Sequence, residues 1–296
     1  MNKPPRVAVI LVAGWGSRML PVTKSLAKPM LPIVNRPSLD YLITDYANAG
    51  IKEFIIVGKQ HFPQVEEYLD RHLELEKMLA DEGKDELLAS ITKFNQLKFT
   101  FVRQAFHTGT GGAIRSCLHL IPEGDPIIAS YADVVTFPRT PAIEMLELYQ
   151  EYGGTMIHVC EVPANETKDF GIAIVKQKVR ENFYQIEGIV EKPAPEEAPS
   201  LFGLFSPMIL CPEVIKILRA LPEPKDKKDS LLLPHIMAEV AQKHLAYIYD
   251  SKGEILDTGL PAGYVKAQIR YAVENPKMKE GILEYMKNIL ATENKG

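Results

Sequence analysis

The sequence is poor in the residues that mark secreted, membrane-anchored or nucleic-acid-binding proteins. It contains only 3 cysteines, an odd number whose spacing fits neither a disulfide framework nor a zinc site. We therefore expect Cys117, Cys160 and Cys211 to be buried as small hydrophobic side chains. The 34 Lys and Arg residues against 38 Asp and Glu residues give a net charge of −4 without a long block of one sign. This balance argues against a nucleic-acid surface or a polybasic membrane anchor.

Long hydrophobic runs are also missing. No apolar run approaches the roughly 18 residues that a membrane helix requires. The first residues lack the hydrophobic length and the small-residue cleavage site of a signal peptide. The sequence therefore predicts a cytoplasmic protein. Its 46% of hydrophobic residues is enough to form the core of an ordinary globular protein.

Strand and helix patterns alternate along the first half of the chain, which indicates an α/β fold. Residues 7–12 form a nearly unbroken apolar run that is followed directly by glycines, as in a buried strand of a parallel sheet. A helical pattern over 39–49 and a strand pattern over 53–57 continue this order, as in βαβ units. Further expected elements are two helices within 62–93, strands at 98–103 and 126–132, and a helix from about Ala113.

The second half of the chain has a less regular strand pattern. Strands are expected at 155–162, 171–175, 183–190 and 202–210, and helices at 261–274 and 276–290. We therefore predict one domain over 1–296, built on a Rossmann-like, mixed and mostly parallel central sheet flanked by helices. The last helix carries apolar residues at helical spacing, which is typical of packing on the body or on another subunit. These residues are Met278, Ile282, Leu283, Met286 and Leu290.

The most informative segment is glycine-rich and basic. Gly14 and Gly16 directly follow the first expected strand, where main-chain N–H groups can approach a ligand. Arg18, Lys24 and Lys28 add positive charge, and the combination favours a polyphosphate. A bare Gly-x-Gly would by itself be more typical of a tight turn with solvated charges. Neither the Walker pattern nor the third glycine of the dinucleotide fingerprint follows.

Several motifs in order resemble the signature of sugar-1-phosphate nucleotidylyltransferases. These motifs are A-G-W-G-S-R-M-L-P-V-T at 13–23, K-P-M-L-P at 28–32, Asp133 at a strand end, V-E-K-P at 190–193 and D-T-G-L-P-A-G-Y at 257–264. The resemblance spans roughly residues 7–270. The segment L-E-L-E-K-M-L at 73–79 and V-R-Q at 102–104 are similar to the bacterial UTP:glucose-1-phosphate uridylyltransferase subfamily.

The resemblance implies an enzyme with a nucleotidyltransferase fold that depends on Mg²⁺. It would transfer a uridylyl group from UTP to glucose 1-phosphate, giving UDP-glucose and pyrophosphate. Such chemistry requires mainly positioning and charge neutralisation. In this family Arg18 would hold the β and γ phosphates, Lys28 the leaving-group charge or the α-phosphate, and Lys192 the sugar phosphate. Asp133 and Asp257 would hold one Mg²⁺, a cation that needs only one or two carboxylates besides phosphate and water.

The resemblance also implies the binding residues and the partners. We expect a nucleotide-binding half at about 1–135, a sugar-binding half at about 136–260 and C-terminal helices at about 261–296. Gln104 can pair with the O4 and N3–H edge of uracil. The substrates would be UTP and a sugar 1-phosphate, with no nucleic acid or membrane partner, and family members assemble as homodimers or homotetramers. The implied nucleotide contacts are Ala13, Gly14, Gly16, Lys28, Gln104 and Gly109, and the implied sugar-phosphate contacts are Gly171, Glu191 and Lys192.

Four positions depart from the uridylyltransferase pattern. Pro29 replaces a glutamate, Ala132 replaces a proline or glycine, and Leu201 and Ser206 replace an asparagine and a glycine on the sugar side. Another nucleotide (dTTP, CTP or GTP) or another sugar 1-phosphate therefore stays open as an alternative. So does a non-catalytic regulator that binds a nucleotide sugar.

Two further residues of the glycine-rich segments have no catalytic role in this interpretation. We expect Trp15 to pack against the base of its own loop or the adjacent sheet. His107, in the second glycine-rich segment, is expected to be a surface-loop residue rather than a ligand.

Overall fold

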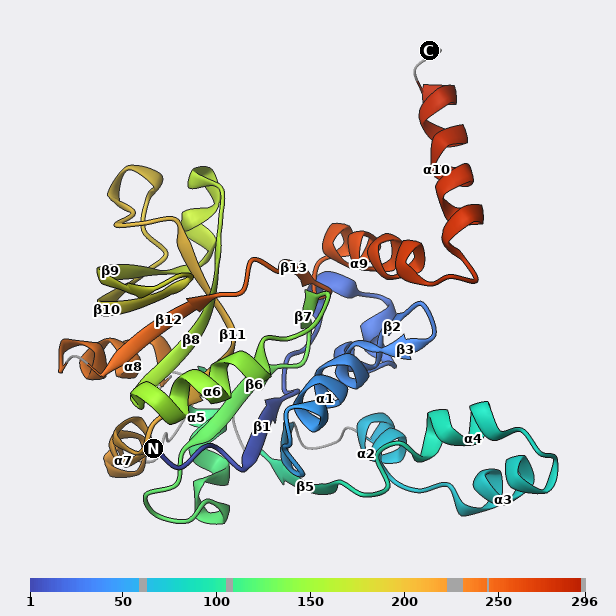
Figure 1. The fold of residues 1–296 in the computed structure, drawn as a ribbon, viewed down its shortest axis with the longest axis horizontal. Helices are drawn as coiled ribbons and strands as arrows, with labels where there is room; N and C mark the ends of the chain where they lie inside the picture. Colours follow the sequence, from blue (N-terminus) through green and yellow to red (C-terminus); the bar gives the residue numbers. More distant parts are fainter. Residues whose placement is uncertain (59–62, 105–108, 223–230, 244, 294–296) are drawn as a thin grey trace.

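The computed structural model describes residues 1–58, 63–104, 109–222, 231–243 and 245–293. Nine strands form its central sheet, drawn in Figure 1. They are β1 (Val7–Leu11), β4 (Glu53–Gly58), β5 (Lys98–Arg103), β6 (Ile127–Tyr131), β8 (Thr155–Glu161), β9 (Gly171–Arg180), β10 (Phe183–Glu191), β11 (Phe202–Leu210) and β12 (Ala246–Asp250). Their order across the sheet is β5-β4-β1-β6-β11-β8-β12-β10-β9.

The mixed sheet confirms the predicted fold class. The block β5-β4-β1-β6 is parallel throughout, with Ala8 of β1 paired to Phe54 on one side and Ile128 on the other. Beyond β6 most neighbours are antiparallel: β11 is antiparallel to both β6 and β8, and β10 to both β12 and β9. The exception is β12, which runs parallel to β8. The parallel character is therefore concentrated in the half that the strand–helix alternation predicted. β12 was missed, since its short A-Y-I-Y-D pattern is a weak signal.

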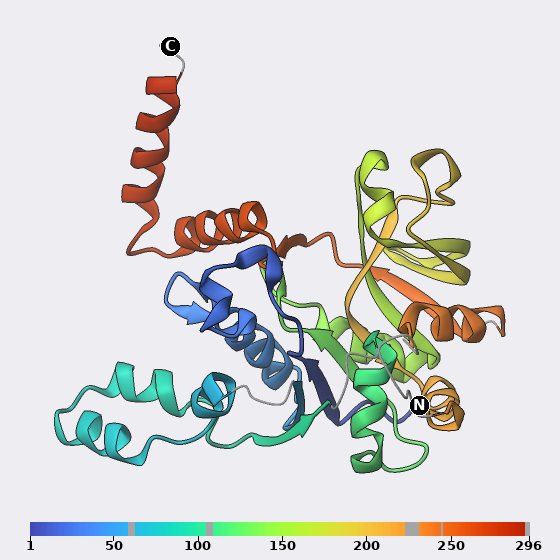
Figure 2. The same ribbon diagram turned by 180° about the vertical axis from the view of Figure 1, so that it is seen from behind.

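Helices cover both faces of the sheet, as comparison of Figures 1 and 2 shows. On one face lie α1 (Ser38–Asn48) and α6 (Ala142–Tyr152). On the other lie α5 (Gly109–Cys117), α7 (Pro212–Ala220) and α8 (Leu233–Gln242). Side chains such as Ile43, Ile56 and Ile114 are fully buried between these layers, and burial of each large apolar side chain contributes about 1.5–3 kcal/mol. One continuous core therefore holds the loops at the sheet edge in place.

Two small sheets stand at the edge of the central one. β2 (Pro32–Ile33) pairs with β3 (Arg36–Pro37), and β7 (Val134–Phe137) pairs with β13 (Glu254–Asp257). In the second pair Val134 lies opposite Asp257, and the N–H of Thr258 donates to the carbonyl of Asp133 at 2.9 Å. This pairing brings two distant acidic residues together, and sequence reasoning had predicted neither strand.

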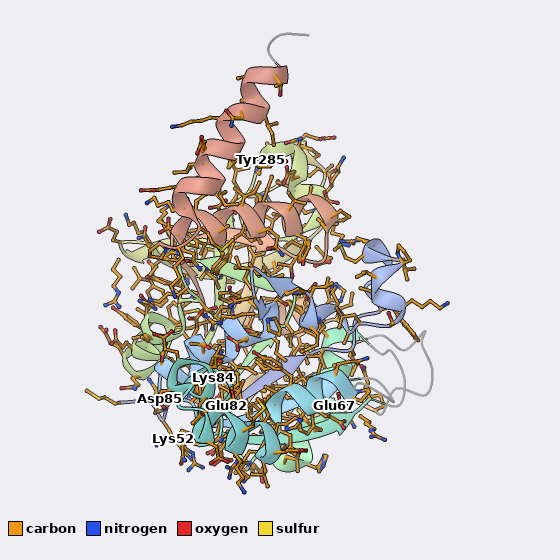
Figure 3. All side chains as sticks on the ribbon, turned by 90° about the vertical axis from the view of Figure 1, so that its right-hand side faces the viewer. Lys52, Glu67, Glu82, Lys84, Asp85 and Tyr285 are labelled. Carbon is orange, nitrogen blue, oxygen red and sulfur yellow. The ribbon has the colours of Figure 1, made fainter. Side chains whose placement is uncertain are left out.

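The segment after β4 contains three helices, where the sequence pattern predicted two. They are α2 (Pro63–Leu69), α3 (Leu73–Asp81) and α4 (Asp85–Thr92), and they extend from the body as an arm (Figure 1). The helical pattern is interrupted before Leu73, because the His72 side chain accepts a hydrogen bond from the N–H of Leu75 at 3.2 Å and caps a new helix. The charged residues Glu82, Lys84 and Asp85 lie on this arm (Figure 3).

A fully buried carboxylate fixes the arm to the body. Asp40 on α1 is 0% exposed and forms ion pairs with Arg36 and with Lys93, the residue that follows α4. Tyr68 of α2 donates a hydrogen bond to the same carboxylate. A buried charge must be paired and hydrogen-bonded to be tolerated, so these contacts define how α1, α2 and α4 meet.

α5 begins earlier than the predicted start near Ala113. It covers Gly109–Cys117, so Gly109, Gly111 and Gly112 are part of the helix. The N–H of Gly111 donates to the carbonyl of Leu231 at 2.8 Å, and a Cβ on Gly111 would lie 2.9 Å from that carbonyl oxygen. A glycine is needed here because another backbone approaches the helix, and a propensity argument cannot detect that contact.

The C-terminal helices are α9 (Pro261–Glu274) and α10 (Lys279–Glu293). α10 contacts α9 and then extends away from the body, with Tyr285 far from it (Figures 1 and 3). The expectation that this helix packs on the body is wrong, since Leu283 and Leu290 are 39% and 61% exposed. The alternative of a partner subunit stays a prediction. Within the part of the chain that the structure describes, no helix has the length and apolar character needed to cross a membrane.

The three cysteines are all free thiols. Cys117 and Cys211 are buried as predicted, and burial raises the pKa of each thiol to about 12. Cys160 is only half-buried, which corrects the expectation for this residue. It lies near the end of β8, where the sheet is less covered.

Candidate functional site

A cavity of about 680 Å³ opens at the carboxyl ends of β1 and β6. Ligands bind at this edge of open α/β sheets, and the volume is in the range of small-molecule sites. It gathers eight of the residues that the sequence had singled out, from segments spread over the whole chain. They are Ala13, Gly14, Arg18, Lys28, Gln104, Gly109, Asp133 and Lys192.

The glycine-rich loop after β1 owes its shape to Gly16. Its φ is +63°, and a Cβ there would lie 2.9 Å from a methyl carbon of Thr23, so only glycine fits without strain. Thr23 closes the loop with a 2.7 Å hydrogen bond to the Gly16 carbonyl. Gly16 does not line the cavity itself, whereas Gly14 does.

Two other residues of this loop lie outside the cavity. Trp15 is 69% exposed, which corrects the expectation that it packs against the loop base or the sheet. Lys24 lines a smaller neighbouring pocket of about 310 Å³ between the loop and α2, together with Trp15 and Gln64.

Lys28, Asp133 and Asp257 converge on one point. A Cβ built on Gly259 would lie 2.9 Å from Asp133 Oδ2, 2.9 Å from Asp257 Oδ1 and 2.9 Å from Lys28 Nζ. Lys28 and Asp133 form an ion pair, and the N–H of Gly259 donates to Asp257 Oδ1 at 2.8 Å. A glycine at position 259 leaves space that any side chain would fill.

The carboxylate of Asp257 is disfavoured in its charged form. Burial raises the pKa of Asp257, and the negative charge of Asp133 raises it further, while the Gly259 N–H, Lys28 and Arg18 act in the opposite direction. Two acids held together in a partly desolvated position favour a bound cation. No cluster of three or more acidic, histidine or cysteine ligands occurs within the described residues. Two carboxylates nonetheless suit a hard divalent cation that takes its other ligands from phosphate and water.

The residues expected on the sugar side lie where β9 begins and where β10 ends. Glu191 pairs with Gly171 across β10 and β9, and a Cβ on Gly171 would lie 3.1 Å from Glu191 Oε2. Lys192 has a φ of +52°, an uncommon conformation for a residue with a side chain and one that clusters at functional sites. Its N–H donates to the carbonyl of Phe170 at 3.0 Å. Lys192 lines the cavity. Glu191 directly precedes it in the sequence, and Gly171 is the strand partner of Glu191.

Gln104 lines the same cavity. It follows β5, its N–H donates to the carbonyl of Gly58 at 2.8 Å, and it is only 8% exposed. Gly109, with a φ of +75°, opens α5 beside it and lines the same cavity. A buried amide presents a donor and an acceptor to a bound base. His107 lies outside the described residues.

Sequence reasoning missed three residues of the site. Thr110 and Tyr131 line the cavity, and Gly259 makes room between the carboxylates. Tyr131 is the last residue of β6 and stands two positions before Asp133, which follows the strand. Ser206, one of the departures from the family pattern, is buried, and its hydroxyl accepts from the Tyr131 N–H at 3.3 Å.

The sequence model of the nucleotidyl transferase family matches residues 7–274. The chain belongs to this family. The UTP–glucose-1-phosphate uridylyltransferase of Staphylococcus haemolyticus is 33% identical to it over 97% of this chain and 99% of the relative. The UTP-bound UGPase from Acinetobacter baumannii superposes with a TM-score of 0.84 at 30% identity, covering 97% of this chain and 99% of the other. A UDP-glucose pyrophosphorylase complexed with UDP-glucose gives a TM-score of 0.79 at 28% identity, covering 92% of this chain and 100% of the other.

Membership of the nucleotidyl transferase family indicates which kinds of group the cavity needs for its substrates. A nucleotidyl transferase needs cationic side chains for a triphosphate and a second place for the acceptor. The cavity is lined by Arg18 and Lys28, from the glycine-rich loop and the segment after it, and by Lys192, which follows β10.

Proposed function

We propose that this nucleotidyl transferase transfers a uridylyl group from UTP to glucose 1-phosphate, releasing pyrophosphate and UDP-glucose. The observation that carries the proposal is the order of groups around the cavity. Gln104 follows β5 at one edge of the sheet, and Lys192 follows β10 near the other edge. Asp133, which converges with Lys28 and Asp257 at Gly259, follows β6 between them. The names of the relatives support this assignment, because they act on UTP and glucose 1-phosphate or bind UTP or UDP-glucose.

The reaction is an in-line displacement at the α-phosphorus. A phosphate oxygen of the sugar 1-phosphate forms the new bond to phosphorus, and the bond to the bridging oxygen breaks, so pyrophosphate leaves with that electron pair. Lys192 holds the attacking phosphate, Arg18 the β and γ phosphates, and Lys28 the charge that develops around the α-phosphate. The protein supplies position and opposite charge, and the nucleophile is already ionised, so no general base is required.

We further propose Mg²⁺ as the cation between Asp133 and Asp257. The fit is supported by the convergence of both carboxylates at Gly259, where a side chain would collide with them, and by the raised pKa of Asp257. When bound, the cation neutralises phosphate charge and polarises the reacting phosphate. Lys28, which is paired with Asp133 in the free protein, provides positive charge at the same place.

The remaining assignments follow from the same arrangement. We propose that Ala13, Gly14, Gln104 and Gly109 hold the base and the adjacent ribose, with Gly16 shaping the loop. Gly171 and Glu191 hold the sugar beside Lys192. Residues 1–135 then act as the nucleotide-binding half and 136–260 as the sugar-binding half of one domain. A cytoplasmic location stays a prediction.

A pyrophosphate-release assay that crosses UTP, dTTP, CTP and GTP with a panel of sugar 1-phosphates tests the proposal. The pair of UTP and glucose 1-phosphate should give the highest kcat/KM. A better rate with another nucleotide or another sugar would replace the substrate and keep the reaction class. Tight binding of UDP-glucose without turnover of any pair would instead identify a regulator.

We also propose that the enzyme is a homodimer or homotetramer in which a second copy covers α10. A single helix without tertiary packing is marginal in water, and Leu283, Tyr285, Ile289 and Leu290 are 39%, 65%, 43% and 61% exposed. Light scattering should give a multiple of the chain mass, and Ile289→Glu with Leu290→Glu should reduce it. Lys287→Glu, on the same helix, is the control. A monomeric wild type would contradict this assembly.

A further inference from the structure

Adjacent residues near the end of β6 point to opposite faces of the sheet. The hydroxyl of Ser130 is hydrogen-bonded to Tyr46 of α1, whereas the side chain of Tyr131 is hydrogen-bonded to Thr110 of α5. Successive side chains of a strand alternate in this way. Tyr131 therefore faces the α5 layer, and both Tyr131 and Thr110 line the cavity.

Tyr131 lies at the boundary between the two halves of the site. In the sheet it pairs with Leu11 of β1 on one side, and its N–H donates to the Ser206 hydroxyl of β11 at 3.3 Å on the other. Its side chain lines the same cavity as Asp133 and Lys192. The phenol therefore shares the cavity with a proposed cation ligand and a proposed sugar-phosphate residue.

The hydrogen bonds of Thr110 set the direction of the Tyr131 proton. The Thr110 hydroxyl oxygen accepts from the N–H of Leu233 at 3.3 Å, which leaves the Thr110 proton for its hydrogen bond to Tyr131. Thr110 is thus the donor and the Tyr131 oxygen the acceptor, which leaves the Tyr131 proton for a ligand. Much of the surrounding cavity wall is apolar, so this hydroxyl is one of a small set of groups that can orient a substrate. The apolar lining residues are Leu11, Val12, Ala113, Ala132 and Val134.

We propose that Tyr131 is a specificity-determining residue for the sugar: its hydroxyl donates a hydrogen bond to a hydroxyl oxygen of the hexose 1-phosphate. Thr110 is the positioning residue that holds the phenol in this orientation. The inference rests on the proposed function, because that function places a hexose between Asp133 and Glu191. A site built to bind a substrate hydroxyl discriminates strongly against an analogue that lacks it, since the polar group of the protein is left unpaired.

The test measures kcat/KM for glucose 1-phosphate and for its 2-, 3-, 4- and 6-deoxy analogues with wild type and Tyr131→Phe. For the wild type, one analogue should be worse than glucose 1-phosphate by more than about tenfold. Tyr131→Phe should lose about tenfold on glucose 1-phosphate and should no longer discriminate against that same analogue. Its KM for UTP should stay within about twofold of wild type, because the proposed hydrogen bond is to the sugar.

Three further variants separate specificity from folding. Thr110→Val, like Tyr131→Phe, should reduce the discrimination against the deoxy analogue. Thr110→Ser keeps the hydroxyl donor and should keep the wild-type discrimination. Tyr46→Phe removes another buried and hydrogen-bonded phenol hydroxyl outside the cavity, and it should leave discrimination unchanged. Calorimetry provides a second measurement: Tyr131→Phe should weaken binding of UDP-glucose and leave binding of UTP unchanged.

The inference is overturned if Tyr131→Phe keeps the wild-type discrimination against all four analogues, or if it raises the KM for UTP as much as that for the sugar. Failure of the proposed function has a different signature. If the wild type prefers another hexose 1-phosphate, glucose is the wrong substrate, and the deoxy analogues of the preferred hexose then decide the role of Tyr131. If no pair is turned over, equal binding of UDP-glucose by wild type and Tyr131→Phe rejects the role.

Discussion

Lys28 and Asp133 lie 105 residues apart in the sequence and form an ion pair in the cavity. The ammonium group is equally close to the space at Gly259, which Asp257 also faces. A positive charge thus already stands where the phosphates and a cation would meet. The arrangement limits the repulsion between two neighbouring carboxylates before any substrate binds.

The first prediction concerns the two carboxylates. Asp133→Asn or Asp257→Asn should each lower kcat by at least about a hundredfold, roughly 2.7 kcal/mol of transition-state stabilisation, at saturating Mg²⁺. The double variant should lose little more, because both residues act through one cation. Steady-state pyrophosphate release measures both effects. Asp70→Asn, at an exposed position after α2, is the control, and near-normal turnover of either single variant removes that residue from the site.

A second prediction separates the two substrates. Lys192→Ala should raise the KM for the sugar 1-phosphate by roughly ten- to a hundredfold, because a hydrogen bond to a charged group contributes about 1.5–3 kcal/mol. The KM for UTP should change far less. The comparison requires initial rates with each substrate varied in turn, with the exposed Lys178→Ala of β9 as control. Equal losses for both substrates would place Lys192 elsewhere.

The third prediction concerns the base. The enzyme should prefer UTP over GTP and CTP by at least about tenfold in kcat/KM, since a buried amide that faces the wrong edge leaves groups unpaired at about 1–3 kcal/mol each. dTTP should be the nearest competitor, because thymine shares the pairing edge of uracil. Gln104→Ala should reduce this preference, whereas Gln150→Ala on α6 should not. An unchanged choice of nucleotide in Gln104→Ala would show that another group reads the base.

A fourth prediction follows from a histidine that the reaction does not use. His158 of β8 is buried between the Ser206 carbonyl and the Ser251 hydroxyl, and burial lowers its pKa from 6.5 to about 4 despite the opposing effects of the Ser206 carbonyl and of Asp250. Between pH 6.5 and 4, His158 is protonated in the unfolded chain but stays neutral in the folded protein. The free energy of unfolding should therefore fall as the pH drops from 6.5 towards 4, by about 3 kcal/mol in total.

Urea unfolding at several pH values between 7 and 5 checks this effect. His158→Gln should be less stable at pH 7, because the buried packing is disturbed, but its stability should depend less on pH than that of wild type. His119→Gln, at an exposed position, should keep the wild-type slope. An equal slope for wild type and His158→Gln would assign the pH dependence to other groups.

The sequence determined the local parts of the site. The apolar run before Gly14 predicts a buried strand, the glycines and Arg18 predict a phosphate-binding loop, and the helix over Pro261–Glu274 has the predicted bounds. Periodicity and turn chemistry depend on neighbouring residues, so they can be recognised without the fold. The ordered motifs add the family, which the comparisons confirm.

Tertiary structure decided what depends on contacts between distant segments. The pairing of β7 with β13 brings Asp257 to Asp133, and no local pattern announces a short two-stranded sheet. The sequence also does not show why position 259 is a glycine, since the reason is that three charged groups converge there. Nor does it show that apolar residues of α10 are left exposed. Tyr131 and Thr110 meet across β6 and α5. Residues far apart in the chain become neighbours only when the core fixes the layers, and the physical environment of each side chain is then set by that packing rather than by its sequence neighbours.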